Sequence, residues 1–113
     1  MRKLLSGGSL SLVLSLAIFL ATPVIGAAEV SGKIVFDRWC IHCHDEGPGN
    51  AGTLRLAIDR GEDRSVLEKR TDLSAQYVKA IVRNGINQMP GYRLLEISDE
   101  ELEKLANYLT NKR

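Results

Sequence analysis

The stretch CIHCH, residues 40–44, decides how this sequence is interpreted. Cys40 and Cys43 are the only cysteines of the chain, and His42 and His44 are its only histidines. Two thiols at this spacing, with an imidazole directly behind them, fit a disulfide, half of a zinc site, a redox-active dithiol or a covalent cofactor anchor. The rest of the sequence has to distinguish these four kinds of site.

The first 28 of the 113 residues have the layout of a secretory signal peptide. Arg2 and Lys3 give a positive start, residues 10–21 are largely apolar, and Pro23 precedes small residues that end at Ala28. The apolar run is shorter than the roughly 20 residues of a membrane-spanning helix. We therefore expect cleavage after Ala28, a periplasmic location in a Gram-negative cell and no stable membrane insertion afterwards, with an uncleaved anchor as the weaker alternative.

Residues 29–113 are predicted to form a single domain. Removing residues 1–28 takes away two basic side chains and no acidic one, which leaves 13 basic and 14 acidic residues. This balance argues against a nucleic-acid partner, because nucleic-acid binding requires a basic surface. A domain of about 85 residues has a marginal apolar core, so we expect an additional link, such as a bound cofactor, to stabilise it.

Hydrophobic periodicity predicts an all-α fold with three core helices and a short connecting helix. The first helix is expected to deliver CIHCH at its C-terminal end. The predicted helices are residues 32–40, 53–60 and 75–84 and a last helix that begins after Ser98. A turn-rich loop over 45–52 and a charged connector over 61–70 separate the first three. Ser31 and Ser74 are expected to cap the first and third helices, and Gly61 and Gly85 to end the second and third.

The last helix is the best specified element of the sequence. Ser98 and Glu101 form a capping box, and Ile97 and Leu102 are spaced as a hydrophobic staple across the helix start. The predicted inward face of this helix comprises Leu102, Leu105, Ala106 and Leu109.

The interpretations of CIHCH differ in what else they require. A structural zinc site needs four ligands, usually as two pairs, and the sequence has no second pair. A redox dithiol is expected beside a strand, and a disulfide between Cys40 and Cys43 would close too short a loop to restrain the unfolded chain. CxxCH is the attachment signature of c-type haem, which predicts covalent attachment at Cys40 and Cys43 and His44 as the proximal iron ligand.

Met89 is the candidate for the sixth iron position. It is the only methionine left after signal removal, and Pro90 and Gly91 constrain the turn that follows it. A lone methionine is more often core filler, but with haem bound and no other ligand available we favour ligation. Histidine and methionine together fill both axial positions and raise the reduction potential, which suits electron transfer.

From Gly32 to Leu109 the sequence resembles the class I c-type cytochromes. The resemblance implies the cytochrome c fold around one covalently bound haem c, with the attachment and ligand residues named above. In this family the first and last helices cross through a small residue and aromatic side chains. The residues that match this crossing are Gly32, Phe36, Leu105, Tyr108 and Leu109.

One feature departs from the family pattern. The family has a proline carbonyl that accepts the second N–H of the proximal histidine and fixes its ring. Here Gly47-Pro48 follows His44 too closely for a direct match. The candidate acceptors are therefore the Pro48 carbonyl and a carbonyl between Ala51 and Thr53.

Four further residues are conspicuous beside these motifs. Trp39 is expected to pack against porphyrin or core. Arg83, Tyr92 and Arg93 flank the expected distal side, and we predict that they are solvated surface, with contact to the haem propionates as the alternative.

Residues 77–92, YVKAIVRNGINQMPGY, are similar to the cytochrome subunits of flavoprotein dehydrogenases of the p-cresol methylhydroxylase type. This resemblance implies a periplasmic electron carrier, not itself an enzyme, that accepts electrons from a flavoprotein or quinoprotein dehydrogenase and passes them to a downstream cytochrome or oxidase. Two alternatives stay open. One is a haem-based ligand-binding or sensor protein with a displaceable sixth ligand, and the other is a disulfide-containing binding protein without haem.

Overall fold

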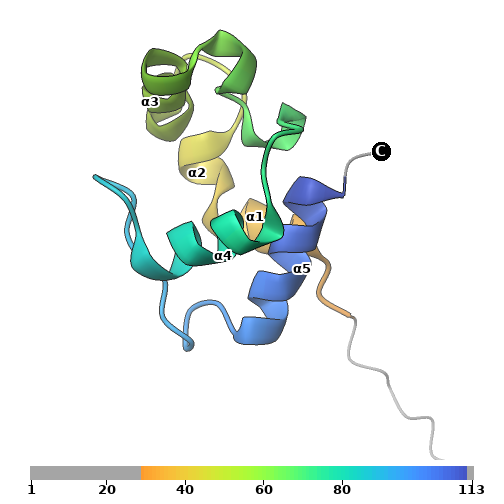
Figure 1. The fold of residues 1–113 in the computed structure, drawn as a ribbon. Helices are drawn as coiled ribbons and strands as arrows, with labels where there is room; N and C mark the ends of the chain where they lie inside the picture. Colours follow the sequence, from red (N-terminus) through yellow and green to blue (C-terminus); the bar gives the residue numbers. More distant parts are fainter. Residues whose placement is uncertain (1–28, 112–113) are drawn as a thin grey trace, which may run out of the picture.

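Five α-helices and two 3₁₀ turns make up residues 29–111, the part of the chain that the computed structural model describes (Figure 1). The predicted signal peptide, residues 1–28, lies outside the described residues. The elements are α1 (Gly32–Trp39), α2 (Ile41–His44), α3 (Ala51–Arg60), η1 (Glu62–Arg64), η2 (Leu67–Lys69), α4 (Ala75–Asn84) and α5 (Asp99–Thr110). Within the described range the only strand-like pairing is an isolated bridge between Ile86 and Met89, so the all-α prediction is confirmed.

The helix ends follow the local sequence signals. Ser31, Ser74 and Ser98 each accept a backbone N–H from the residue three positions ahead, at 3.3, 3.2 and 3.2 Å. The Glu101 carboxylate in turn accepts the Ser98 backbone N–H at 3.0 Å, which completes the predicted capping box. Gly61 and Gly85 end α3 and α4 with φ of 94° and 71°, a region that glycine adopts readily.

Two helix boundaries differ from the prediction. The first helix ends at Trp39, so CIHCH lies on the separate turn α2 rather than at the end of α1. The third begins at Ala51, two residues early, because the Asn50 carbonyl already accepts a helical N–H at 2.9 Å. The Asn50 side chain also donates to two carbonyls of the preceding loop and folds that loop back. Gly52 is therefore inside a helix and not in the predicted loop.

The core lies where α1 and α4 pack against α5. Gly32 allows the closest approach of α1 to α5, because a Cβ atom built there would lie 2.1 Å from the Lys104 carbonyl oxygen. Next to it, the rings of Phe36 and Tyr108 meet with centroids 6.1 Å apart. The crossing and the inward face of α5 are thus as predicted. The buried hydrophobic residues are Val35, Phe36, Val78, Val82, Ile97, Leu102, Leu105, Ala106 and Leu109.

None of the helices within residues 29–111 combines the length and the apolar character that crossing a membrane requires. The longest of them, α5, has 12 residues and starts with three acidic side chains.

Candidate functional site

The residues of CIHCH form one helical turn directly behind α1. The backbone N–H groups of Cys43 and His44 donate to the Cys40 carbonyl at 3.1 and 2.9 Å. Cys40 is partly buried, Cys43 is exposed, and both are free thiols. A single turn therefore carries two thiols and an imidazole, as the sequence predicts.

The two thiols differ in exposure, and burial changes the pKa of one of them. Burial raises the pKa of the Cys40 thiol to about 12, and the neighbouring Cys43 adds to the rise, so Cys40 is not a thiolate at neutral pH. Within residues 29–111 there is no group of three or more His, Cys, Asp or Glu side chains placed to bind a metal ion.

The His44 imidazole is held in a neutral state with one nitrogen covered. Burial lowers its pKa, and the neutral ring is the form that ligates metals. Nδ1 is buried and finds no hydrogen-bond partner in the described part of the chain. The other ring nitrogen, Nε2, is not among the buried atoms that lack a partner. Neither Pro48 nor residues 51–53 supply the expected acceptor, although the first turn of α3 lies against the ring.

Gly52 is the residue that permits this contact. A Cβ atom built on Gly52 would lie 2.7 Å from His44 Cε1, 2.8 Å from His44 Nδ1 and 2.7 Å from the Cys43 carbonyl oxygen. The adjacent Thr53 is buried, and its hydroxyl donates to the Asp45 carbonyl at 2.8 Å. These contacts hold α3 directly over the histidine. From the sequence, only the backbone carbonyls of residues 51–53 were candidates in this segment, and no sequence signal indicated the close approach at Gly52 or the bond of the Thr53 hydroxyl.

Met89 closes a tight turn in the loop between α4 and α5. The backbones of Ile86 and Met89 exchange two hydrogen bonds, at 3.1 and 2.9 Å, across a turn in which Asn87 has φ of 52°. The Met89 side chain is partly buried and packs against the same hydrophobic core as Cys40. The structure therefore brings the predicted distal residue and the predicted attachment motif to a common core.

Tyr92 connects the Met89 loop to the attachment motif. Its hydroxyl donates to the Trp39 carbonyl at 3.2 Å, and its ring meets the Trp39 ring edge-on with centroids 5.6 Å apart. Burial raises the pKa of Tyr92, and the nearby thiols of Cys40 and Cys43 add to the rise. The prediction of solvated surface is therefore wrong for Tyr92, whereas Trp39 packs against the core as expected.

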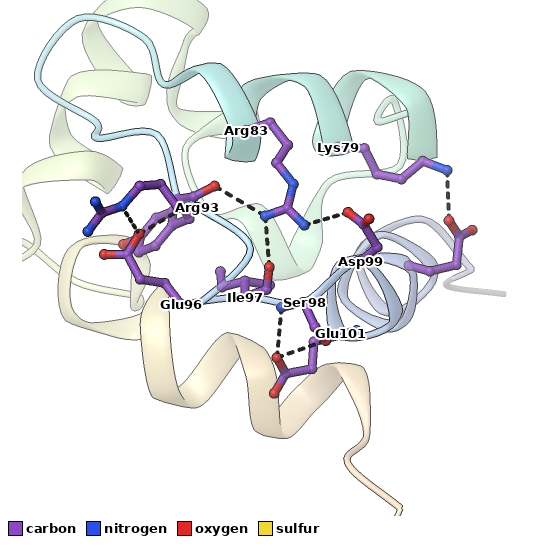
Figure 2. Close-up of polar contacts among 10 residues, drawn as sticks. Lys79, Arg83, Arg93, Glu96, Ile97, Ser98, Asp99 and Glu101 are labelled. Carbon is purple, nitrogen blue, oxygen red and sulfur yellow. Dashed lines mark hydrogen bonds and ion pairs between the residues drawn. The ribbon is translucent and has the colours of Figure 1, made fainter.

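The two arginines beside this loop behave differently. The Arg93 side chain is 83% exposed, as predicted for solvated surface. Arg83 is only 23% exposed and donates to two backbone carbonyls and one carboxylate (Figure 2). The surface prediction is wrong for Arg83, because its acceptors come from a segment that is distant in sequence and folds back onto α4.

Exposed apolar side chains flank the motif and the Met89 loop. Leu54 and Ile58 on α3 are 46% and 76% exposed, and Leu94 and Leu95 in the α4–α5 loop are 61% and 98% exposed. These side chains are available to a bound ligand or partner. Two thiols, a neutral imidazole, a thioether and an apolar surround are the chemical groups that a covalently held porphyrin requires, so the residues present fit haem c.

Comparison with known proteins agrees with this fit. Residues 27–109 match the family model described as cytochrome c oxidase, cbb3-type, subunit III. The chain is 36% identical to the 4-cresol dehydrogenase (hydroxylating) cytochrome c subunit of Pseudomonas putida, over 72% of this chain but only 59% of that protein's length. It is 30% identical to cytochrome c6 of Nostoc sp., over 88% of this chain and 87% of that protein.

A solved structure extends the comparison to three dimensions. The chain aligns with one chain of the crystal structure of p-cresol methylhydroxylase with substrate bound, at a TM-score of 0.52 and 34% sequence identity. The alignment covers 74% of this chain and 93% of that one. The similarity therefore extends over about three quarters of this chain and nearly the whole matched chain.

Proposed function

Because the chain belongs to the c-type cytochromes, in the family of cytochrome c oxidase, cbb3-type, subunit III, we propose that it is a periplasmic electron carrier that accepts electrons from a dehydrogenase. Haem c is the cofactor of its relatives and electron transfer is their function. The observation that carries the proposal is the single turn Cys40–His44, with two thiols beside a neutral imidazole whose Nδ1 is covered by α3.

We assign four residues to the cofactor. Cys40 and Cys43 hold it covalently, His44 is the proximal ligand, and Met89 is the distal ligand. When bound, haem c supplies a reversible one-electron iron couple. With haem c bound, His44 and Met89 would ligate the iron, α3 would keep the His44 ring in place, and the apolar side chains of α3 and the α4–α5 loop would limit the access of water. A full coordination sphere leaves no position for a substrate, which supports a carrier rather than an enzyme.

The proposed donor is a flavoprotein or quinoprotein dehydrogenase, and the proposed acceptor is a downstream cytochrome or oxidase. The name of the Pseudomonas putida relative, a cytochrome c subunit of a dehydrogenase, supports the donor. The signal-peptide layout of residues 1–28 supports export and cleavage near Ala28.

The first test is the mass and spectrum of the protein exported by a host with haem-attachment machinery. We expect the mass of one haem added to the chain that begins near Glu29, and in the ferric protein the weak charge-transfer band of methionine bound to iron. A secreted chain without added tetrapyrrole would contradict the haem assignment and leave the disulfide-containing binding protein as the interpretation.

The second test is Met89→Ala in the haem-loaded protein. A methionine that occupies the iron about 99% of the time weakens the apparent binding of an added ligand about 100-fold, so the substitution should tighten imidazole binding by that order and eliminate the charge-transfer band. Gln88→Ala, an exposed neighbour in the same turn, is the control and should change neither. Equal imidazole affinity in Met89→Ala and wild type would favour a ligand-binding or sensor protein with an open sixth position.

A further inference from the structure

The loop that carries Met89 leaves α4 and returns to it. The loop starts at Gly85, and seven residues later the Tyr92 backbone N–H donates to the Val82 carbonyl at 2.8 Å. At this point the backbones are nearly in contact, because a Cβ atom on Gly91 would lie 2.6 Å from the Arg83 carbonyl oxygen. Both ends of the Met89 loop are therefore attached to the last turn of α4.

The Arg83 side chain adds a second attachment at the same place. Its Nη1 donates to the Tyr92 carbonyl at 3.1 Å and to the Ile97 carbonyl at 2.8 Å, and its Nη2 donates to Asp99 Oδ1 at 2.8 Å (Figure 2). Since Ile97 is fully buried, one of these acceptors belongs to a fixed part of the core. A single guanidinium thus connects α4, the far end of the Met89 loop and the first turn of α5.

From this geometry we infer that Arg83 is a positioning residue that keeps Met89 on the iron. The inference rests on the proposed function, in which Met89 is the distal ligand. Apart from the Ile86–Met89 turn itself, the loop is bonded at its start, where the Gly85 N–H continues the helical pattern of α4 to the Ile81 carbonyl, and at its far end, where the Tyr92 N–H donates to the Val82 carbonyl. The far end is the one that the Arg83 side chain also holds. When that end opens, the thioether can move away with the turn, so the closure at Tyr92 determines how often the iron position is free.

The charge environment of Arg83 is compatible with a fixed position. Asp99 is its carboxylate partner, and Lys79 on the same helix is itself paired with Glu103 at 2.7 Å (Figure 2). A planar guanidinium serves three acceptors in different directions, which a lysine ammonium on a flexible stem does less well. Loss of the guanidinium leaves the partly buried carbonyls of Tyr92 and Ile97 without this donor.

The test measures imidazole binding to the ferric, haem-loaded protein together with the methionine-to-iron charge-transfer band. We expect Arg83→Gln to tighten apparent imidazole binding about tenfold and to weaken the band, because the iron position is open more often. Arg93→Gln is the matched control, since it removes the same charge from an exposed side chain in the same loop. It should leave both readouts unchanged. If Arg83→Gln behaves like Arg93→Gln, the inference is overturned.

A double substitution separates positioning from a general loosening of the fold. In a Met89→Ala background there is no thioether to displace, so adding Arg83→Gln should not change imidazole affinity further. An equal increase in both backgrounds would show that Arg83 merely opens the site, and would overturn the inference. If Arg83→Gln fails to load haem, Arg83→Lys is measured in its place. We expect Arg83→Lys to tighten apparent imidazole binding by less than Arg83→Gln would, and unchanged imidazole binding would overturn the inference.

The same data distinguish this inference from the proposed function. A wild-type protein that lacks the charge-transfer band, or whose imidazole affinity does not respond to Met89→Ala, contradicts the ligand assignment itself. A wild-type protein with the band and a response to Met89→Ala, but none to Arg83→Gln or Arg83→Lys, contradicts only the role of Arg83.

Discussion

At the scale of single residues, Gly52 shows the difference between chemistry that a sequence displays and chemistry that depends on packing. Roles for Cys40, Cys43 and His44 can be proposed from their identities and spacing, because covalent attachment of haem needs those atoms in that order. Gly52 matters only because α3 lies against the His44 ring, and that approach is a property of the folded chain. A glycine in a glycine-rich stretch gives no indication of it.

Gly52→Ala is expected to push α3 away from His44. The new methyl group has no room between the imidazole and the Cys43 carbonyl, and overpacking of this kind lowers the free energy of unfolding by about 1–3 kcal/mol. Denaturant unfolding of the haem-loaded protein, followed by absorbance and circular dichroism, measures the change. Gly49→Ala is the control from the same stretch, because nothing lies within 4 Å of its added Cβ atom. Equal unfolding midpoints for the two variants would refute the contact.

The roles of the polar side chains of Arg83 and Tyr92 also depend on the folded chain rather than on residue identity. Arginine is mostly exposed in proteins, so solvated surface was the reasonable expectation for Arg83. Its acceptors are backbone carbonyls 9 and 14 residues away, and the Tyr92 hydroxyl donates to a carbonyl 53 residues away. Backbone acceptors carry no mark in the sequence, which is why only the structure reveals them.

At the scale of helices, the boundaries that depend on local signals were predicted and those that depend on loop conformation were not. Ser31, Ser74 and Ser98 cap their helices from the preceding residue, which is a property of a few adjacent positions. The early start of α3 depends instead on the side chain of Asn50, which bonds back to the loop at Glu46 and Gly47. That arrangement requires the loop to be folded already.

Gly32→Ala tests the packing of α1 on α5. The added methyl group would meet the Lys104 carbonyl oxygen at 2.1 Å, and a backbone atom cannot move aside without its helix. We expect the two helices to separate and the free energy of unfolding to fall by about 1–3 kcal/mol. Lys33→Ala, at the next position and exposed, is the matched control, because a solvent-screened surface ion pair such as that with Asp37 contributes little to stability. Thermal unfolding of both variants provides the comparison, and a shift no larger than that of the control would contradict the crossing.

At the scale of the whole molecule, the fold class and the cofactor could be predicted from local patterns and family resemblance, but the arrangement around the cofactor could not. Helix periodicity and caps are local, and CxxCH in a helical chain without a second pair of metal ligands predicts haem c. The route by which the Met89 loop returns to the motif depends on Tyr92 and Trp39, which are far apart in the chain. Contacts of that range follow from the complete fold.

Loss of the cofactor is expected to affect the entire domain. The exposed leucines and isoleucine beside the motif show how much apolar surface the polypeptide leaves uncovered by itself. Replacing Cys40 and Cys43 together by alanine should abolish covalent haem and leave a chain with reduced helical circular dichroism and increased binding of a hydrophobic dye. His42→Ala changes an exposed residue inside the same motif and should retain both haem and fold. A natively folded double variant would contradict a structural role for the cofactor.

The crossing of α1 and α5 has a consequence for how the protein is made. The helix behind Ser31 finds its main packing partner only in residues 99–110, so a partly synthesised chain that lacks the last helix leaves this face of α1 without its main cover. We therefore expect Cys40 and Cys43 to stay accessible until residues 99–110 have packed against α1.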